Sequence, residues 1–515
     1  MAANVSRLAD EDGDFSDWIE VHNPDNVAVP LAGYHLTDDA ANLDKWTFPA
    51  VNLNPGATLV VFASGKNRTA PSAPKARLHT NFRLSADGEY LALVAPDGVT
   101  VVSAFAPSYP RQFRDESFGL SLDFGPPLSD DLVWSFFSIP TPGKPNNNGT
   151  HAGPIISVVE KNPTQPEVGP LTVSVVVRST NEPVETVKLY YRKMFERDTM
   201  LPMNDDGIEG DAVASDGVWT AVIPGKAFAP GEMTRWRFVA TDLDGTATKE
   251  PAYRARLDSH QYFGTVARDS SIRSSLPVLH WFTRNVSAAG SSSGSRGAVY
   301  YNGEFYDNVY FRRHGQSSAG FPKKSYNIDF NRTQRFRWNA NAPRVADIDL
   351  LTNWADKSKV RHVLAYEVMR EAGVAAHFAH TVRVQHNGDF FSTADLVEDA
   401  DETYLERAGL NTDGALYKIY ANSLNKDSGN NATTGVEKKT RRFENNADLQ
   451  SLINGLDLRG QALVNYLYDN IDIPRCVNLL AANSVIRNID MHRKNWYIYR
   501  DTGRSGEWAI LPWDL

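Results

Sequence analysis

The chain has 515 residues, of which 42% are hydrophobic and 22% are charged, and its formal net charge is −9. This composition excludes a mostly disordered chain, no apolar run reaches the ~20 residues that span a bilayer, and no basic excess points to nucleic acid as a partner. At roughly 150 residues per domain, the length suggests about three domains.

The two ends of the chain look cut from a longer protein. The start lacks the basic and apolar regions of a signal peptide, and the end, Leu511 to Leu515, follows directly on a predicted strand. A single cysteine, Cys476, excludes an intrachain disulfide.

The first half of the chain consists of short β patterns separated by turn residues. Residues 1–145 predict an all-β sandwich, and a Pro/Asn/Gly-rich linker follows from Ile139 to Pro154. Residues 155–258 predict a second β module of immunoglobulin or fibronectin type, with clear alternation in 171–177. We therefore expect two β sandwiches in tandem.

Residues 275–515 change to a mixed α and β pattern. Strand patterns come first, then a helix pattern over 358–372 and a hairpin that turns at Asn387-Gly388. Helix patterns follow around 402–408 and between 448 and 489. This order, β-rich and then helical, is typical of a two-lobed catalytic domain.

The most informative motif lies at the C-terminal end. Asp490 and Asn495 are in D-x-x-x-x-N spacing before a predicted hairpin, and Asp514 follows that hairpin. The hairpin would bring these three oxygen ligands together, as Mg²⁺ or Mn²⁺ beside phosphates requires. Protein kinases arrange a catalytic Asp, a metal-binding Asn and a second metal-binding Asp in this order. The alternative is that Asp490 caps a turn and Asp514 forms a surface salt bridge.

Residues ~275–515 resemble the CotH family of atypical kinases, first known from bacterial spore coats. The stretches that carry this resemblance are RRHGQSS (312–318), FPKKSY (321–326), NWADKSKVR (353–361), DMHRKN (490–495) and PWD (512–514). Residues 1–145 resemble a lamin-tail domain through DGDFSDWIE (12–20), LAGYHLTD (31–38) and PTPGKPN (140–146). The fold class expected is two all-β sandwich modules followed by an α+β protein-kinase-like CotH domain that is truncated at its C-terminal end.

The CotH resemblance implies ATP and a divalent metal, Mg²⁺ or Mn²⁺, as cofactors. Asp490 would be the catalytic residue, and Asn495 and Asp514 would bind the metal. Arg312 would clamp phosphate oxygens, because a guanidinium donates in two directions. Many family members carry a second arginine at the position of His314, which leaves a phosphate contact from that position open.

The resemblance also implies that a lysine of the 323–330 strand contacts the nucleotide phosphates. Strand alternation sends Lys323 and Lys324 to opposite faces, so only one of them would reach the nucleotide. Lys324 is favoured, because Tyr326, Ile328 and Phe330 share its face and would form an apolar wall beside the base. A solvated lysine on an edge strand remains the alternative for either.

The hinge between the two lobes is expected at Glu398 and Asp399, where backbone groups would meet the adenine. Glu367, on the predicted helix, would either pair with the nucleotide lysine or lie exposed. Asp356 and Arg361 are interpreted as a cap and brace at the start of that helix.

A weaker acidic pattern occurs in the second β module. Asp205-Asp206-Gly207, Gly210-Asp211 and Asp216-Gly217 would suit Ca²⁺, although tight turns alone also explain such a pattern.

These observations predict an exported kinase that transfers a phosphoryl group from Mg- or Mn-ATP to a protein hydroxyl. Its partners would be a protein substrate or another extracellular or cell-surface protein, and its location is inferred from the company of domains. The alternative is a surface adhesion or structural protein whose CotH-like domain is catalytically silent.

Overall fold

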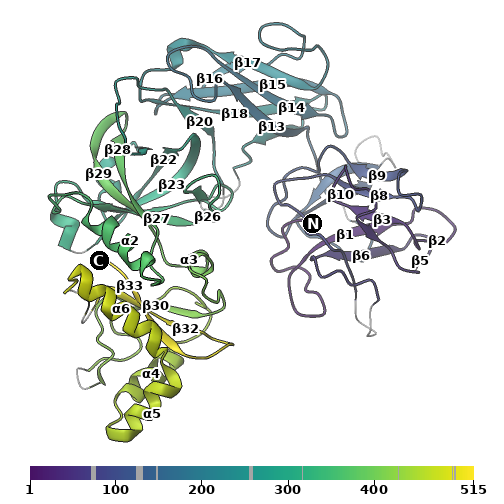
Figure 1. Cartoon of the computed structure of the whole chain (residues 1–515). Helices are drawn as coiled ribbons and strands as arrows, with labels where there is room; N and C mark the ends of the chain where they lie inside the picture. The colour runs from purple at the N-terminus through teal and green to yellow at the C-terminus, as the bar shows by residue number, and fades with distance from the viewer. Residues whose placement is uncertain are drawn as a thin grey trace.

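A computed structural model of the chain describes residues 1–70, 77–122, 132–146, 149–253, 259–315, 317–426, 429–489, 491 and 494–515. Three parts follow one another in an arc, with the N-terminal β domain at one end and the helical region at the other (Figure 1). The expected order of two β modules followed by an α+β domain is confirmed. None of the helices in the described segments is long and apolar enough to cross a bilayer.

The N-terminal domain is built from short strands around one apolar core. Its main sheets have the orders β1-β6-β7 and β4-β3-β8-β9, with a pair β2-β5 and a further sheet β10-β11-β12. Trp46, Phe48 and Val61 are buried in its core. The strands are β1 Asp17–His22, β2 Val29–Pro30, β3 His35–Thr37, β4 Trp46–Thr47, β5 Asn52–Leu53, β6 Thr58–Ala63, β7 Leu78–His79, β8 Leu91–Val94, β9 Val101–Phe105, β10 Ser117–Leu122, β11 Leu132–Phe137 and β12 Thr150–His151.

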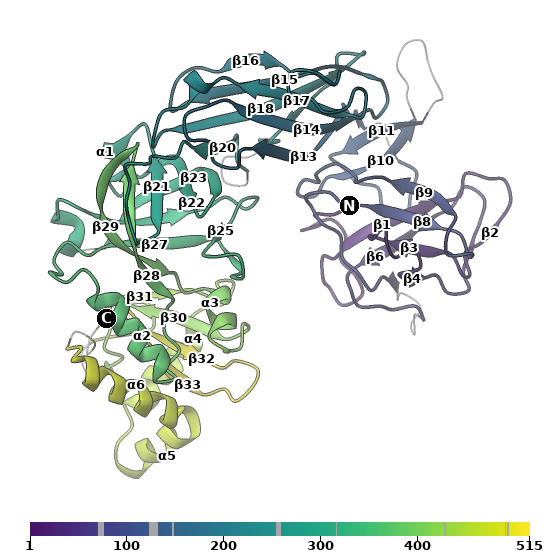
Figure 2. The same ribbon diagram turned by 45° about the horizontal axis from the view of Figure 1, so that its top comes forward.

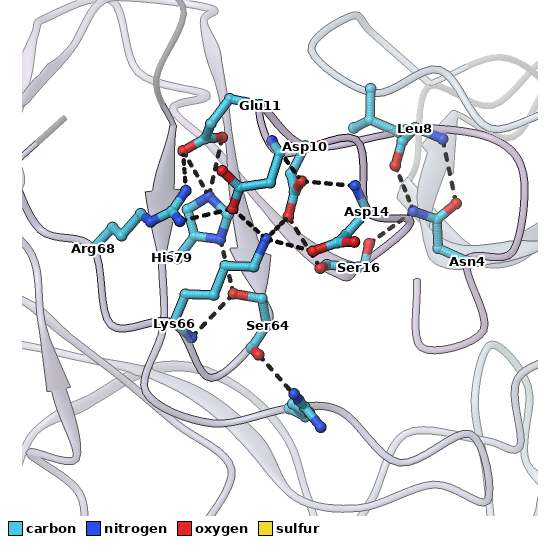
Figure 3. A network of polar contacts seen from close by, with 12 residues as sticks. Asn4, Leu8, Asp10, Glu11, Asp14, Ser16, Ser64, Lys66, Arg68 and His79 are labelled. Atoms are coloured by element: carbon cyan, nitrogen blue, oxygen red, sulfur yellow. Dashed lines mark hydrogen bonds and ion pairs between the residues drawn. The ribbon is translucent and has the colours of Figure 1, made fainter. Parts of the chain in front are cut away.

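Lys66 connects its own loop to the loop of residues 10–14 by ion pairs. The Lys66 ammonium lies 2.6 Å from a carboxylate oxygen of Asp10 and 2.9 Å from one of Asp14 (Figure 3). It also lies 2.6 Å from a carboxylate oxygen of Asp12. Its charge offsets the repulsion among three carboxylates that lie within 4.8 Å of one another. The Lys66 ammonium therefore balances part of the charge of the three carboxylates.

The second module is a sandwich of two antiparallel sheets, β13-β14-β17 and β16-β15-β18-β19, with β20 also paired to β18. The alternation expected from the sequence is confirmed in β14, where Val173, Val175 and Val177 face the core and the residues between them are partly exposed. Its elements are β13 Ile155–Asn162, β14 Leu171–Arg178, β15 Val184–Lys193, β16 Thr199–Pro202, β17 Val218–Ile223, the 3₁₀ turn η1 Gly225–Ala227, β18 Met233–Asp242, β19 Ala247–Glu250 and β20 Phe263–Val266.

The third part begins with a closed barrel of strand order β21-β22-β23-β24-β27-β29-β28. The ends of this order, β21 and β28, close the barrel as a parallel pair. The elements are β21 Val278–Phe282, α1 Val286–Ala289, β22 Ser295–Tyr301, β23 Glu304–His314, η2 Ser317–Gly320, β24 Ser325–Asp329, β25 Phe336–Arg337, β26 Arg344–Val345, β27 Asp347–Thr352, α2 Arg361–Glu371, β28 Ala379–His386 and β29 Asp389–Glu398.

Residues 400–515, which we call the helical lobe, follow the barrel. A four-stranded sheet of order β31-β30-β32-β33 is packed with helices, and α6 contacts both β33 and the barrel helix α2 (Figures 1 and 2). The elements are α3 Glu402–Arg407, β30 Ala415–Ile419, β31 Val436–Lys438, α4 Ala447–Leu456, α5 Gly460–Asn470, α6 Ile473–Ile486, β32 Trp496–Arg500 and β33 Trp508–Pro512.

The second module is joined to the barrel by packing and by charge. Met233 and Val266 of the module share one apolar cluster with Phe282 and Phe305 of the barrel. Beside this cluster, a nitrogen of Arg235 lies 3.2 Å from a carboxylate oxygen of the buried Asp307. The module is therefore a fixed extension of the barrel.

Candidate functional site

The hairpin β32–β33 brings the two predicted metal ligands of the described chain to one end. Trp496 pairs with Pro512, so the antiparallel register sets Asn495 opposite Trp513, beside Asp514. Asn495 and Asp514 both have left-handed backbones, with φ of 66° and 53°. Asp514 is exposed and Asn495 is largely buried. Asp490 lies outside the described residues, so its predicted role as catalytic residue stays a prediction.

Trp513 holds this end of the hairpin between the lobes. Its buried indole contacts His377 edge-on, with ring centroids 5.0 Å apart, and the Lys418 ammonium lies 4.1 Å from the centre of its ring. From the barrel, the His314 ring approaches it to 6.4 Å. Both lobes therefore fix the residue that precedes Asp514.

A row of polar side chains on the outer face of the barrel approaches the same place. The Arg312 Nε donates to Asn327 Oδ1 (2.9 Å), and the Asn327 amide donates to Asp349 Oδ1 (3.1 Å). The His314 Nδ1 is 3.3 Å from that same Asp349 oxygen. These residues come from β23, β24 and β27, where the register aligns Arg312, Asn327 and Asp349 across three strands. We call Arg312, His314, Lys418, Trp513 and Asp514 the interlobe site.

A buried ion pair lies beside the interlobe site. Lys439 donates to Asp399 at 2.7 Å, and both side chains are buried. Burial disfavours the Asp399 carboxylate, but the charges of Lys439 and Lys418 outweigh it and lower the pKa of Asp399 to about 2. Burial raises the pKa of Asp347 to about 8, and the charge of Asp399 adds to this rise. Two carboxyl groups at this end of the barrel therefore have pKa values shifted in opposite directions, that of Asp399 downward and that of Asp347 upward.

The two predicted nucleotide lysines lie at the end of β24 that is joined to η2. The Lys324 ammonium donates to the carbonyl oxygen of Gly290 at 3.1 Å, and that of Lys323 lies 4.3 Å from the centre of the Phe391 ring. The expectation of an apolar wall beside a base is wrong. Tyr326, Ile328 and Phe330, the residues expected on the face of Lys324, fill the barrel core, because the sheet closes on itself.

The predicted hinge residue Glu398 is engaged within the fold. Its buried carboxylate pairs with Arg407 at 2.6 Å, and it also accepts from the Phe378 N–H at 3.0 Å. Its own N–H donates to the Phe378 carbonyl, and its carbonyl lies 2.8 Å from the His377 Nδ1. Burial raises the pKa of Glu398, which Arg407 opposes. The side chain and both backbone polar groups of Glu398 are therefore bonded within the fold, and its contact with adenine stays a prediction.

The helix α2, which follows β27, has the predicted cap at its start. It begins at Arg361 rather than at Ser358, because the Asp356 carboxylate accepts from the Ser358 and Arg361 N–H groups and holds a turn before it. This cap and brace is as predicted, and Glu367 is exposed.

The acidic turns of the second module do come together. Carboxylate oxygens of Asp205, Asp211 and Asp216 lie within 4.8 Å of one another. Asp205 accepts from the N–H groups of Asp216 and Gly217, both at 3.1 Å, and Asp211 accepts from Gly207 at 2.7 Å. These contacts order the turns, and the binding of Ca²⁺ by the three carboxylates stays a prediction.

Sequence reasoning missed Lys418, Lys439, Asp399 as a charged group, and Asp349. The only signal for Lys418 was its place between two apolar residues of a strand. Such a place predicts that the lysine is half-buried, but it does not predict which side chains lie beside it in the fold. Its position over Trp513 depends on a strand pairing between segments about eighty residues apart.

The donor types at the hairpin end suit a hard divalent cation. Asp514 offers an exposed carboxylate and Asn495 an amide, and both ligand types are oxygen donors that Mg²⁺ and Mn²⁺ accept. The residues present therefore fit the metal that the kinase resemblance implies.

Two family models match parts of the chain. Residues 5–106 match the Lamin Tail Domain model, and residues 311–515 match the model described as CotH kinase protein. No curated protein matches the chain. The chain thus carries a lamin tail domain followed, in the predicted order, by a domain of the CotH kinase family.

Proposed function

We propose that this chain is an atypical kinase that binds ATP with Mg²⁺ or Mn²⁺ at the interlobe site and transfers a phosphoryl group to a protein hydroxyl. The observation that carries the proposal is the setting of Asp514. Its carboxylate is exposed, and its backbone is fixed by Trp513 and by the Tyr366 hydroxyl, which accepts its N–H at 3.2 Å. A single exposed acid held this firmly between two lobes has the character of a ligand rather than of a surface charge.

The residues around Asp514 divide into two roles in this proposal. Asp514 and Asn495 hold the metal, which offsets charge on the phosphates. Arg312 and Lys418 bind phosphate oxygens from opposite lobes, Arg312 from the barrel and Lys418 from β30. Asp490 orients the acceptor hydroxyl and takes its proton, as the family pattern implies.

Lys418 is a stronger candidate for the phosphate-binding lysine than Lys324. The Lys418 ammonium lies over the ring next to Asp514, whereas the Lys324 ammonium is bonded to Gly290. Lys324 would have to leave that carbonyl to meet a phosphate.

We also propose that the protein acts outside the cell or at its surface. The pairing of a lamin tail domain with a CotH domain supports this location, and the substrate would then be an extracellular or surface protein.

The first test is thermal unfolding of the whole chain with and without ATP and Mn²⁺. A ligand that binds only the folded state raises the midpoint. We expect a shift that requires the metal, is absent in Asp514→Asn and persists in the control Asp501→Asn, which alters the acid at the closed end of the same hairpin. If ATP binds, transfer of labelled phosphate to a protein acceptor is measured next, with Asp490→Asn as the inactive reference.

The outcomes separate binding from catalysis. A shift without transfer in a folded protein would reject the kinase activity and support a silent domain with a surface-binding role. Absence of any shift would reject the nucleotide site itself.

A further inference from the structure

A cavity of about 660 Å³ lies apart from the interlobe site, between the C-terminal ends of α2 and α3 and the first turn of α6. Three of its lining residues are arginines, one from each helix: Arg370, Arg407 and Arg475. The lining carboxylate is that of Asp472, and no residue of the interlobe site contributes to the wall. Positive charge therefore exceeds negative charge among the side chains that line this cavity.

Each guanidinium is held in place from one side. Arg407 donates to the buried Glu398 and to the carbonyl oxygen of Ala376 (2.8 Å). Arg475 donates through Nε to Asp472 at 3.0 Å. Arg407 is thus fixed by a buried acid, and Arg475 by an acid of the same wall.

Arg370 is anchored without an acid. It donates through one Nη to the carbonyl oxygen of His377, and its guanidinium lies 5.8 Å from the centre of the Phe378 ring. Within the described part of the chain, the other guanidinium nitrogens of Arg370 and Arg475 have no hydrogen-bond partner. These fixed donors are available to a ligand in the cavity.

The charges around Arg370 act in both directions. Burial lowers the pKa of Arg370, and the positive charge of Arg407 lowers it further, while Glu367 and Glu371 of the same helix and the buried Glu398 act in the opposite direction. Two guanidinium groups are therefore held near one another at an energetic cost. An anion between them would relieve their repulsion.

We propose that this cavity, which we call the arginine pocket, binds a phosphoryl group carried by a small molecule or by a phosphorylated side chain. Arginine presents a planar fork of N–H donors that matches phosphate oxygens. The unbonded guanidinium donors of Arg370 and Arg475 come from two separate helices and point to different oxygens, which suits a tetrahedral group better than a planar carboxylate. The cavity is also larger than a phosphate ion, which leaves room for the group that carries it. This inference holds whether or not the chain transfers phosphate.

Binding of pyrophosphate and of a phosphoserine heptapeptide to the whole chain, measured by calorimetry at 150 mM KCl without divalent metal, tests the arginine pocket. We expect the double variant Arg370→Gln/Arg475→Gln to weaken binding at least tenfold. Arg407 is left intact, because its loss would strand the buried Glu398. The exposed Arg459→Gln in the same lobe is the matched control.

Two further arms keep the result decisive. Pyrophosphate bound at the interlobe site forms a separate component of the titration, which Lys418→Met removes and the arginine variants keep, so the component that remains in Lys418→Met reports on the arginine pocket. Arg475→Gln alone, at a side chain 40% exposed, tests the pocket with little risk to folding and should weaken binding about threefold to tenfold. Tighter binding of pyrophosphate assigns a small phosphorylated molecule, and tighter binding of the peptide assigns a phosphorylated side chain. The proposal is overturned if neither probe binds, or if binding is lost in Lys418→Met and kept in the arginine variants.

Discussion

The backbone N–H of Asp514 donates to the hydroxyl of Tyr366, 3.2 Å away across 148 residues of sequence. Tyr366 lies on α2 and is fully buried, and burial together with the charge of Asp514 raises its pKa well above the usual value. The hydroxyl therefore stays neutral and can accept. This bond connects the barrel helix to the proposed metal ligand.

Removal of that hydroxyl should weaken nucleotide binding. Tyr366→Phe keeps the ring in the core but leaves the Asp514 N–H without its acceptor, at a cost of about 1 kcal/mol. We expect about fivefold weaker binding of Mn-ATP, measured by titration calorimetry. Tyr404→Phe is the control, because Tyr404 is equally buried and its hydroxyl donates to the Ala375 carbonyl, at 2.7 Å. Equal losses in the two variants would show that Tyr366 acts only through stability.

A second prediction distinguishes the candidate phosphate lysines. Lys418→Met should reduce Mn-ATP affinity at least tenfold, since it removes the ammonium next to Trp513, whereas Lys324→Met should leave affinity within a factor of two. Lys438→Met provides a control on the neighbouring strand, where the ammonium donates to the Asn445 carbonyl. A larger loss of Mn-ATP affinity in Lys324→Met than in Lys418→Met would assign the phosphate contact to Lys324.

The sequence was sufficient for features that depend on neighbours along the chain. The hairpin that joins Asn495 to Asp514, the alternation in β14 and the cap at Asp356 all follow from local spacing, and all are present. The region between 448 and 489 forms three helices, α4, α5 and α6, separated by two breaks. Pro474, at the start of α6, is a sequence signal for the second break.

Features that depend on closure of a sheet or on distant pairs were not predictable in this way. Alternation grouped Tyr326 with Ile328 on one face, but nothing local says that this face becomes a barrel interior. The Lys439–Asp399 pair joins residues forty positions apart, and either residue alone reads as a surface charge.

The stability of the barrel should fall with rising pH through Asp347. Its pKa is raised to about 8 in the folded state by burial and by Asp399, against about 3.9 for an unfolded Asp. Between pH 4 and 8 the unfolded state releases this proton while the folded state keeps it, so the free energy of unfolding decreases as pH rises. We expect the free energy of unfolding of the wild type, measured in urea, to decrease by about 1 kcal/mol or more between pH 5.5 and 8.5. Asp347→Asn should remove this decrease. Asp389→Asn, at an exposed barrel residue, should leave the slope as in the wild type.

In the lamin tail domain, Lys66→Met should loosen the loop that carries Asp10, Asp12 and Asp14. The variant leaves three close carboxylates without their shared ammonium, and Asp10 has no exposed side-chain surface through which to recover hydration. We expect a loss of about 1–2 kcal/mol in the local opening free energy, seen as faster amide exchange in residues 10–14. Lys45→Met, which breaks a single surface pair with Asp38, should change exchange there by much less.

The pH dependence of the Lys66 variant gives the sharper test. Burial raises the pKa of Asp10, but Lys66 and backbone N–H groups outweigh it and lower the pKa below its usual value, and Arg68 and Lys66 lower that of Asp12 to about 2. Carboxylates with lowered pKa stabilise the fold above about pH 4, and that stability is lost as pH falls toward 2. The difference between wild type and Lys66→Met should therefore shrink below pH 4, as protonation removes the repulsion that the lysine had balanced. A difference that stays constant from pH 7 to pH 3 would show that Lys66 contributes through the packing of its aliphatic chain and not through its charge.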